Sequence, residues 1–84
     1  MSEREIGKVT HYFSRIGVVG VTLTDRLRVG DSIHVKGHTT DFTATVDRMQ
    51  VEHKDVQDAG PGDDVAVHVP QRAREHDVLL KVEG

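Results

Sequence analysis

The chain contains no cysteine and no tryptophan, and its 84 residues include only two phenylalanines, one tyrosine and two prolines. Without cysteine it can form no disulfide, no thiolate metal site and no cysteine nucleophile. With so few aromatic side chains it lacks the broad stacking platform on which many proteins bind single-stranded nucleic acid. Its stability must therefore come from aliphatic side chains packed in one small domain.

An excess of positive charge is also missing. The chain has 11 Lys and Arg residues against 14 Asp and Glu residues, which gives a formal net charge of -3. Such a balance supplies no overall attraction to a polyanion, so nucleic-acid binding would need a local basic patch. The sequence has no apolar run long enough for a membrane span or a signal peptide. We expect a cytoplasmic protein with no membrane partner.

Motifs that indicate catalysis or nucleotide binding are absent as well. There is no GxxxxGK[ST] loop to hold phosphates and no Gly-x-Ser-x-Gly turn to present a nucleophile. Six histidines are scattered along the chain: His11, His34, His38, His53, His68 and His76. His34 and His38 are four residues apart, but they span a strand end and a loop and not a helix, and no HExxH motif is present. We therefore expect no catalytic residues, no metal, no cofactor and no bound nucleotide, and we predict that the protein is not an enzyme.

What the sequence does contain is a series of short segments in which apolar and polar residues alternate. This period of two is typical of strands with one buried face, and it occurs at residues 6–13, 18–24, 32–36, 42–51, 65–69 and 78–82. A phase shift near Asp47 and Arg48 predicts a one-residue bulge, and Gly20 inside its strand predicts a bend, a bulge or a close backbone approach.

The expected fold is therefore all-β. We predict a single domain over residues 1–84, built as a small six- or seven-stranded barrel that is closed or nearly closed. Residues 1–5 are expected to form a flexible N-terminus, because they precede the first alternating segment.

Two turns of similar composition each precede one of these strands. Gly30 and Asp31 precede residues 32–36, and Gly60, Gly62 and Asp63 precede residues 65–69. Glycine adopts positive φ at little cost, and an aspartate side chain accepts hydrogen bonds from nearby backbone N–H groups. We predict that these residues fix where the two strands begin.

The order of these segments resembles the second domain of translational GTPases such as elongation factor Tu and initiation factor 2. The resemblance rests on Gly7 and Val9, on RVGDSI at 28–33 and on AGPGDDV at 59–65, and it covers nearly the whole chain. With GHTTDF at 37–42 and MQVEH at 49–53, the chain is similar to small stand-alone proteins of the translation elongation factor-like type. Related domains close the C-terminus of some U32-type peptidases. The resemblance implies the β-barrel of elongation factor Tu domain II.

The same resemblance implies a binding surface. In the GTPases this barrel helps to hold the aminoacyl end of transfer RNA, through the segment matching 49–53 and the position after the second Gly-Asp turn. Here these places include Gln50, Glu52, His53 and Asp64. We expect residues 50–53 to form a strand with a polar face, and we note that the carboxylate of Asp64 would repel phosphate.

Two functions are compatible with these observations. The first is a non-catalytic binding module associated with translation or RNA handling, with RNA or a ribosome- or translation-associated protein as its partner. The alternative is a protein-interaction accessory domain for a separately encoded peptidase or RNA-modifying partner. In both, a rigid β scaffold would present the loops at 14–17, 37–41 and 57–62 together with the segment 50–53.

Overall fold

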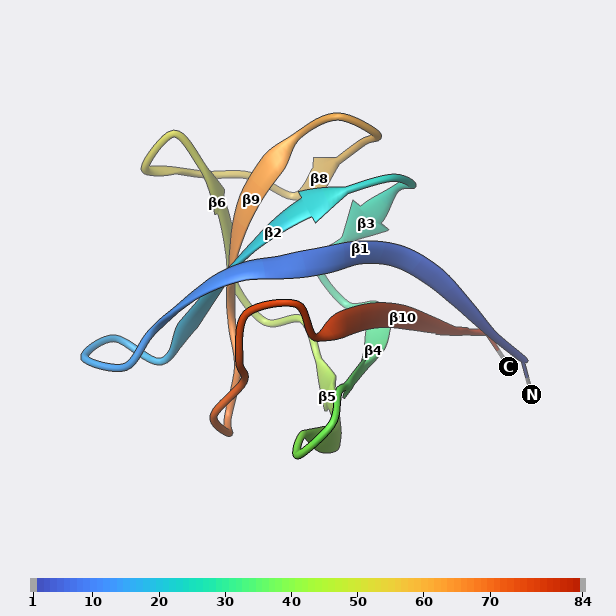
Figure 1. The fold of residues 1–84 in the computed structure, drawn as a ribbon. Coiled ribbons are helices and arrows are strands. Elements are labelled where there is room, and N and C mark those ends of the chain that lie inside the picture. The colour runs from blue at the N-terminus through green and yellow to red at the C-terminus, as the bar shows by residue number, and fades with distance from the viewer. Residues whose placement is uncertain (1, 84) are drawn as a thin grey trace.

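The computed structural model describes residues 2–83, and these form an all-β fold, as the alternating segments predicted (Figure 1). In chain order its strands are β1 (Ser2–Phe13), β2 (Val18–Leu23), β3 (Leu27–Arg28), β4 (Ser32–Lys36), β5 (Asp41–Thr45), β6 (Met49–Val51), β7 (Lys54–Asp55), β8 (Asp58–Ala59), β9 (Asp64–His68) and β10 (Val78–Glu83). The predicted number of strands was too low, because two-residue strands such as β3, β7 and β8 are too short to show an alternation.

Eight of these strands form one antiparallel sheet, in the order β5-β4-β10-β1-β2-β9-β6-β7, and β3 pairs with β8 in a second, two-stranded sheet. The edges of the large sheet are β5 and β7, and within residues 2–83 no strand pairing joins them. The expected closed barrel is therefore not seen. The chain itself links the two ends of the sheet, because it leaves β5 at one edge and enters β6 near the other.

The predicted bulge near Asp47 and Arg48 is this crossing between the two ends of the sheet. Residues 46–48 belong to no strand, and Val46 is tied to the first Gly-Asp turn on both sides. Its N–H donates to the carbonyl of Asp31 at 2.9 Å, and its carbonyl accepts from the N–H of Gly30 at 2.8 Å. A phase shift within one strand and a connection between two strands give the same sequence pattern.

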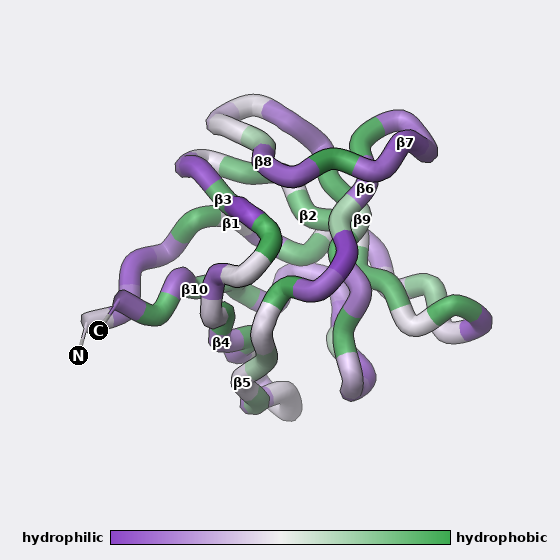
Figure 2. The backbone as a smooth tube through the Cα atoms, turned by 180° about the vertical axis from the view of Figure 1, so that it is seen from behind, coloured by the Kyte–Doolittle hydropathy of each residue, from purple (hydrophilic) through white to green (hydrophobic). Residues whose placement is uncertain are grey.

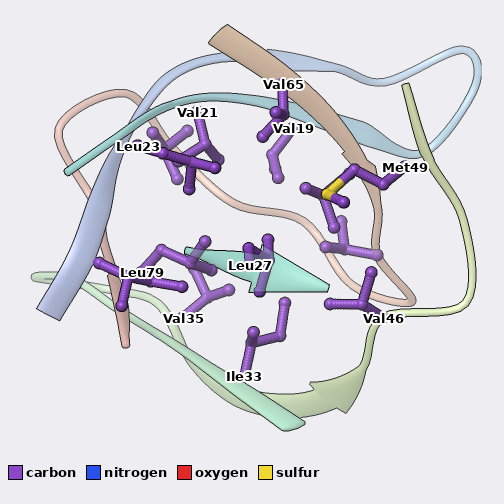
Figure 3. Packing of buried hydrophobic residues seen from close by; sticks show 14 of the residues in the cluster. Val19, Val21, Leu23, Leu27, Ile33, Val35, Val46, Met49, Val65 and Leu79 are labelled. Carbon is purple, nitrogen blue, oxygen red and sulfur yellow. The ribbon is translucent and has the colours of Figure 1, made fainter. Parts of the chain in front are cut away.

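The core lies inside the curve of the large sheet and is made almost entirely of aliphatic side chains (Figure 3). Leu27, from the small sheet, is fully buried and lies between Val19 and Ile33 in this view. Each Val, Ile or Leu that is fully buried contributes about 1.5–3 kcal/mol of hydrophobic free energy. A chain without disulfides can therefore be held together by these side chains.

Two bulges in β1 decide which of its residues face the core. Its register with β10 shifts between Glu5 and Gly7, and its register with β2 shifts between Val9 and His11. Because a bulge reverses the alternation beyond it, Tyr12 packs against the core and Phe13 is exposed. An unbroken alternation over residues 6–13 would place Phe13 on the same face as Val9.

Gly20 lies in β2 opposite the second of these bulges, where it pairs with His11. The hydroxyl of Thr10, the extra residue of the bulge, donates to the carbonyl of Gly20 at 3.1 Å. A Cβ at Gly20 would lie 3.2 Å from this hydroxyl oxygen. Of the three features expected at Gly20, a bend, a bulge or a close backbone approach, the structure shows a bulge, which lies in the partner strand β1.

The first residues of the chain differ from the flexible segment that we expected. Ser2 pairs with Glu83, and residues 2–5 continue β1 along β10. The guanidinium of Arg4 forms ion pairs with Asp25 at 3.1 Å and with Glu83 at 3.0 Å. Residue 1 lies outside the described residues.

The two Gly-Asp turns have the expected geometry. Gly30 and Gly62 have φ values of 99° and 89°, in the left-handed region that glycine tolerates best. In each turn the aspartate carboxylate accepts a hydrogen bond of 2.9 Å from the N–H three residues earlier, Arg28 to Asp31 and Gly60 to Asp63. The strands β4 and β9 begin directly after these aspartates.

A third turn of the same kind precedes β10, and the sequence did not reveal it. The carboxylate of Asp77 accepts a hydrogen bond of 2.8 Å from the N–H of Arg74, again three residues earlier. His76 stands where the other two turns have glycine, and its φ is 74°. The missing glycine explains why this turn was overlooked.

No helix in residues 2–83 is long and apolar enough to cross a membrane.

Candidate functional site

The described residues form a groove of about 380 Å³ on the outer face of the sheet. It lies between the β1–β2 hairpin and the β6–β7 hairpin, with β9 between them, and is lined by Phe13, Ile16, Val18, Gln50, Glu52, His53, Asp64, Val65 and Ala66. A second hollow of about 260 Å³ shares Ile16, Val18, Gln50 and Ala66 with it and extends to Arg48 and His68. The two hollows together make one elongated surface, which we call the groove.

The pairing of β2, β9 and β6 explains the shape of the groove. Ala66 of β9 pairs with Gly20 on one side and with Gln50 on the other. Residues that are paired in this way share a face of the sheet. The methyl group of Ala66 projects little from that face, so a hollow remains above the middle of β9. Beside it, the Thr10 hydroxyl and the Phe13 ring lie close to the Cβ position of Gly20.

Polar groups lie at both ends of this hollow, two residues along each strand from its centre. At one end Val18 pairs with His68, whose N–H donates to the carbonyl of Arg48 at 3.1 Å. At the other end Thr22 pairs with Asp64, and Glu52, which follows β6, lines the same hollow. The groove therefore has a basic end, a small and apolar centre and an acidic end.

All four residues of the predicted binding surface line this groove: Gln50, Glu52, His53 and Asp64. Their backbone differs from the expectation, however. The predicted strand over residues 50–53 ends at Val51, and Glu52 and His53 form the turn between β6 and β7. A strand was the wrong prediction because neither turn residue is one that normally marks a hairpin turn.

The β6–β7 turn has an unusual backbone for its residues. Glu52 has a φ of 53° and His53 a φ of 65°. Two-residue hairpins with positive φ at both positions favour Asn-Gly, because other side chains cost about 1 kcal/mol or more in this conformation. Both residues of this strained turn line the groove.

Neighbouring side chains hold Gln50 in place. Its amide N–H donates to the carboxylate of Asp55 at 3.1 Å, and the Nε–H of Arg48 donates to the same oxygen at 3.1 Å. The hydrogen bond from Gln50 and that from Arg48 lower the pKa of Asp55. Asp55 thus remains ionised near neutral pH and neutralises the charge of Arg48.

The charges at the two ends of the groove differ in their partners. At the basic end Arg48 is paired with Asp55, and Nδ1 of His68 lies 3.2 Å from Asp47. At the acidic end Asp64 accepts a hydrogen bond of 2.7 Å from the neutral hydroxyl of Thr22. Among residues 2–83 neither Glu52 nor Asp64 belongs to any of the ion pairs. The net charge of the groove is therefore negative at this end.

Two exposed apolar side chains line the groove: Phe13, which the sequence did not single out, and Ile16, which lies in the loop at 14–17 that we expected to present contacts. Their exposed fractions are 44% and 63%, and among the described residues they are the large apolar side chains that are exposed. The β1–β2 hairpin that carries them projects from the sheet in Figure 1, and Figure 2 shows hydrophobic segments extending into it. The signal in the sequence was apolar residues on both sides of a polar hairpin loop.

The other loops and histidines singled out in the sequence lie elsewhere. The segments 37–41 and 57–62 contribute no residue to the groove. The imidazole of His34 lies between the carboxylates of Asp41 and Glu3, on the edge side of the sheet. Within residues 2–83 no three His, Asp or Glu side chains converge in a way that could hold a metal ion.

Comparison with known proteins places this fold. The chain superposes on the crystal structure of the C-terminal domain of a Geobacillus thermoleovorans protein assigned as a U32 peptidase, with a TM-score of 0.88 and 20% identity, over 95% of this chain and 93% of that one. The selenomethionine variant of the same domain gives a TM-score of 0.85 and 20% identity, over 90% and 96%. The chain therefore has the fold of a U32 peptidase C-terminal domain.

The sequence adds a more specific relationship. The chain is 38% identical over 80 residues to an uncharacterised protease of Methanocaldococcus jannaschii, and this match covers 92% of the chain but only 20% of the protease. No family model matches the sequence. The chain is thus homologous to one segment of this protease, and the segment makes up about a fifth of the protease's length. These similarities support the expected relationship to the C-terminal domains of U32-type peptidases. They do not show the expected resemblance to the second domain of translational GTPases.

Proposed function

We propose that the chain is a non-catalytic protein-docking module that serves a peptidase of the U32 type. One observation carries this proposal: the large apolar side chains that are exposed among residues 2–83, Phe13 and Ile16, both line the same groove. The fold shared with a U32 peptidase C-terminal domain and the identity to a protease support the choice of partner.

The energetics favour an apolar contact with another protein. Covering an exposed Ile or Phe side chain contributes about 1.5–3 kcal/mol, which is the range of a hot-spot residue in a protein interface. Everywhere else the described chain keeps its large apolar side chains at least partly buried. Exposure of two of them on one hairpin therefore marks an interaction site.

RNA is a weaker candidate for the same groove. The carboxylates of Glu52 and Asp64 repel phosphates, and Arg48 is already paired with Asp55. The formal net charge of -3 adds no long-range attraction. A role in translation or RNA handling would need a basic surface that this groove does not provide.

Site-specific photo-crosslinking in cells tests the proposal. A photoreactive residue replaces Ile16 in the groove or, as a control, the exposed His38 in the β4–β5 loop. We expect the probe at position 16 to form an adduct with a U32-type peptidase that is absent with the probe at position 38. Adducts with RNA, which ribonuclease would remove, or the same protein adducts from both positions would contradict the proposal.

A further inference from the structure

We infer that the groove selects a protein segment in which an apolar side chain and a Lys or Arg side chain are separated by one residue. This inference rests on the proposed docking function and specifies the chemistry of the partner. It is carried by the arrangement of side chains along β9, where an apolar centre adjoins an acidic end.

The apolar position is set by the centre of the groove. The small side chain of Ala66 leaves the hollow above the sheet, and Phe13, Ile16 and Val18 wall it on the side of the β1–β2 hairpin. An aliphatic or aromatic side chain that enters here removes exposed apolar surface of the hairpin from water. A polar side chain would gain little at this point, because the walls offer it few hydrogen-bonding groups.

The cationic position is set by Glu52 and Asp64. Both carboxylates line the same hollow, Glu52 from the β6–β7 turn and Asp64 from the start of β9, and neither is in an ion pair among the described residues. A guanidinium or ammonium group placed between them would form charge-assisted hydrogen bonds to both. An acidic side chain at this point would be repelled.

The spacing follows from strand geometry. Asp64 and Ala66 are two residues apart on β9, and a strand rises about 3.3 Å per residue, so the acidic end and the apolar centre are about 7 Å apart. A partner segment in an extended conformation repeats by the same distance every second residue. The two side chains therefore occupy positions i and i+2 of the partner.

The test uses three acetylated and amidated tripeptides, Leu-Ala-Arg, Leu-Ala-Glu and Ala-Ala-Arg, titrated into the ¹⁵N-labelled chain at low salt. We expect millimolar binding that shifts the amide resonances of Gln50 and Ala66. Leu-Ala-Arg should bind about 3- to 10-fold more tightly than the other two peptides, as expected for one favourable ion pair or one apolar side chain. High salt should reduce its advantage over Leu-Ala-Glu.

Matched variants separate a local effect from one of net charge. The double variant Glu52→Gln/Asp64→Asn should abolish the preference for Leu-Ala-Arg over Leu-Ala-Glu. The double variant Glu5→Gln/Asp58→Asn removes the same charge from exposed positions outside the groove and should keep that preference.

The outcomes distinguish the two proposals. Equal binding of Leu-Ala-Arg and Leu-Ala-Glu, with groove shifts in both, would overturn the cationic selection and leave docking by apolar contact intact. Equal binding of Leu-Ala-Arg and Ala-Ala-Arg would overturn the apolar position. Absence of any shift at the groove with all three peptides would overturn this inference, and failure of the separate crosslinking experiment would overturn the proposed function.

Discussion

The carboxylate of Asp77 packs against the α-carbon of Gly37, where β10 begins beside the end of β4. Asp77 is buried, and its carboxylate accepts the hydrogen bond from the N–H of Arg74 that closes the third turn. The N–H of Gly37 donates to the carbonyl of Thr40 at 2.7 Å and so closes the β4–β5 loop. The contact between Asp77 and Gly37 thus joins two turns that are far apart in the sequence.

Gly37→Ala should lower the free energy of unfolding by about 1–3 kcal/mol, the usual cost of adding a methyl group to a filled site. A Cβ at Gly37 would lie closer than 3.0 Å to the Asp77 carboxylate, which cannot move without losing the N–H of Arg74. Gly60→Ala is the control, because no atom lies within 4 Å of its Cβ position. Urea unfolding of both variants measures the difference, and equal stabilities would contradict the contact.

In each of the three turns that end in aspartate, the residue before the aspartate has a positive φ. Two opposite substitutions at this position test what that conformation costs. Gly62→Ala should cost about 1–2 kcal/mol, because φ at this position is 89° and only glycine adopts it freely. His76→Gly should instead stabilise the chain, because His76 has a φ of 74° in the equivalent position. For a domain of this size, 1 kcal/mol corresponds to about 4–8 °C in Tm, so thermal unfolding resolves both effects. Shifts of the same sign would show that the turns are not equivalent.

Substituting the two residues of the β6–β7 turn should raise the stability of the chain and at the same time weaken its binding of a partner. The double variant Glu52→Asn/His53→Gly supplies the residues that such a turn favours and should raise the free energy of unfolding by about 1 kcal/mol. The same change removes Glu52 from the acidic end of the groove and should weaken binding of Leu-Ala-Arg. Lower stability in this variant would contradict the strain that the φ values of 53° and 65° indicate.

His34 should make the stability of the fold depend on pH. The hydrogen bond to Asp41 and that to Glu3 raise the pKa of His34 above 6.5, although burial opposes this. Because the folded state binds the proton more tightly, this stabilisation is fully present below pH 6.5 and is lost as the pH rises through the folded pKa. Chemical unfolding across this range should show the decline, and His34→Gln should remove it. An NMR titration of the imidazole gives the pKa directly.

Ile16 is exposed and Ile33 is buried, so we expect the first to contribute to binding and the second to stability. Ile16→Ala should change the free energy of unfolding by less than about 0.5 kcal/mol, because 63% of Ile16 is exposed. Ile33→Ala should cost about 2–5 kcal/mol, because Ile33 is fully buried in the core. Ile16→Ala should nevertheless weaken binding of Leu-Ala-Arg. A large loss of stability in Ile16→Ala would show that the residue serves the fold and not the groove.

Much of the fold could be predicted from the sequence, because its strands alternate in hydrophobicity and two of its turns contain glycine and aspartate. The strand β4 has the bounds that the alternation gave, Ser32–Lys36. The third turn was missed because His76 replaces glycine, and a histidine at positive φ leaves no clear mark on the sequence. Whether the barrel is closed or nearly closed was left open, because edge pairing is a long-range property that no single segment encodes; in the described residues the edges β5 and β7 are not paired.

The site was predicted only in part, for a similar reason. Gln50, Glu52, His53 and Asp64 were found through a resemblance, and they line one groove. Phe13 was not among them, because the bulge at Thr10 that turns it outward depends on the pairing of β1 with β2.

The pairing of Ser2 with Glu83 has a consequence for how this domain can be combined with others. Two neighbouring strands carry the ends of the described chain out on the same side, and the β1–β2 hairpin lies at the opposite side (Figure 1). Residues of this hairpin line the groove. A linker attached at either end, or short linkers attached at both ends, would therefore not cover the groove. The unit could be appended to a larger enzyme, inserted into one of its surface loops or circularly permuted, and in each arrangement it would present the same face.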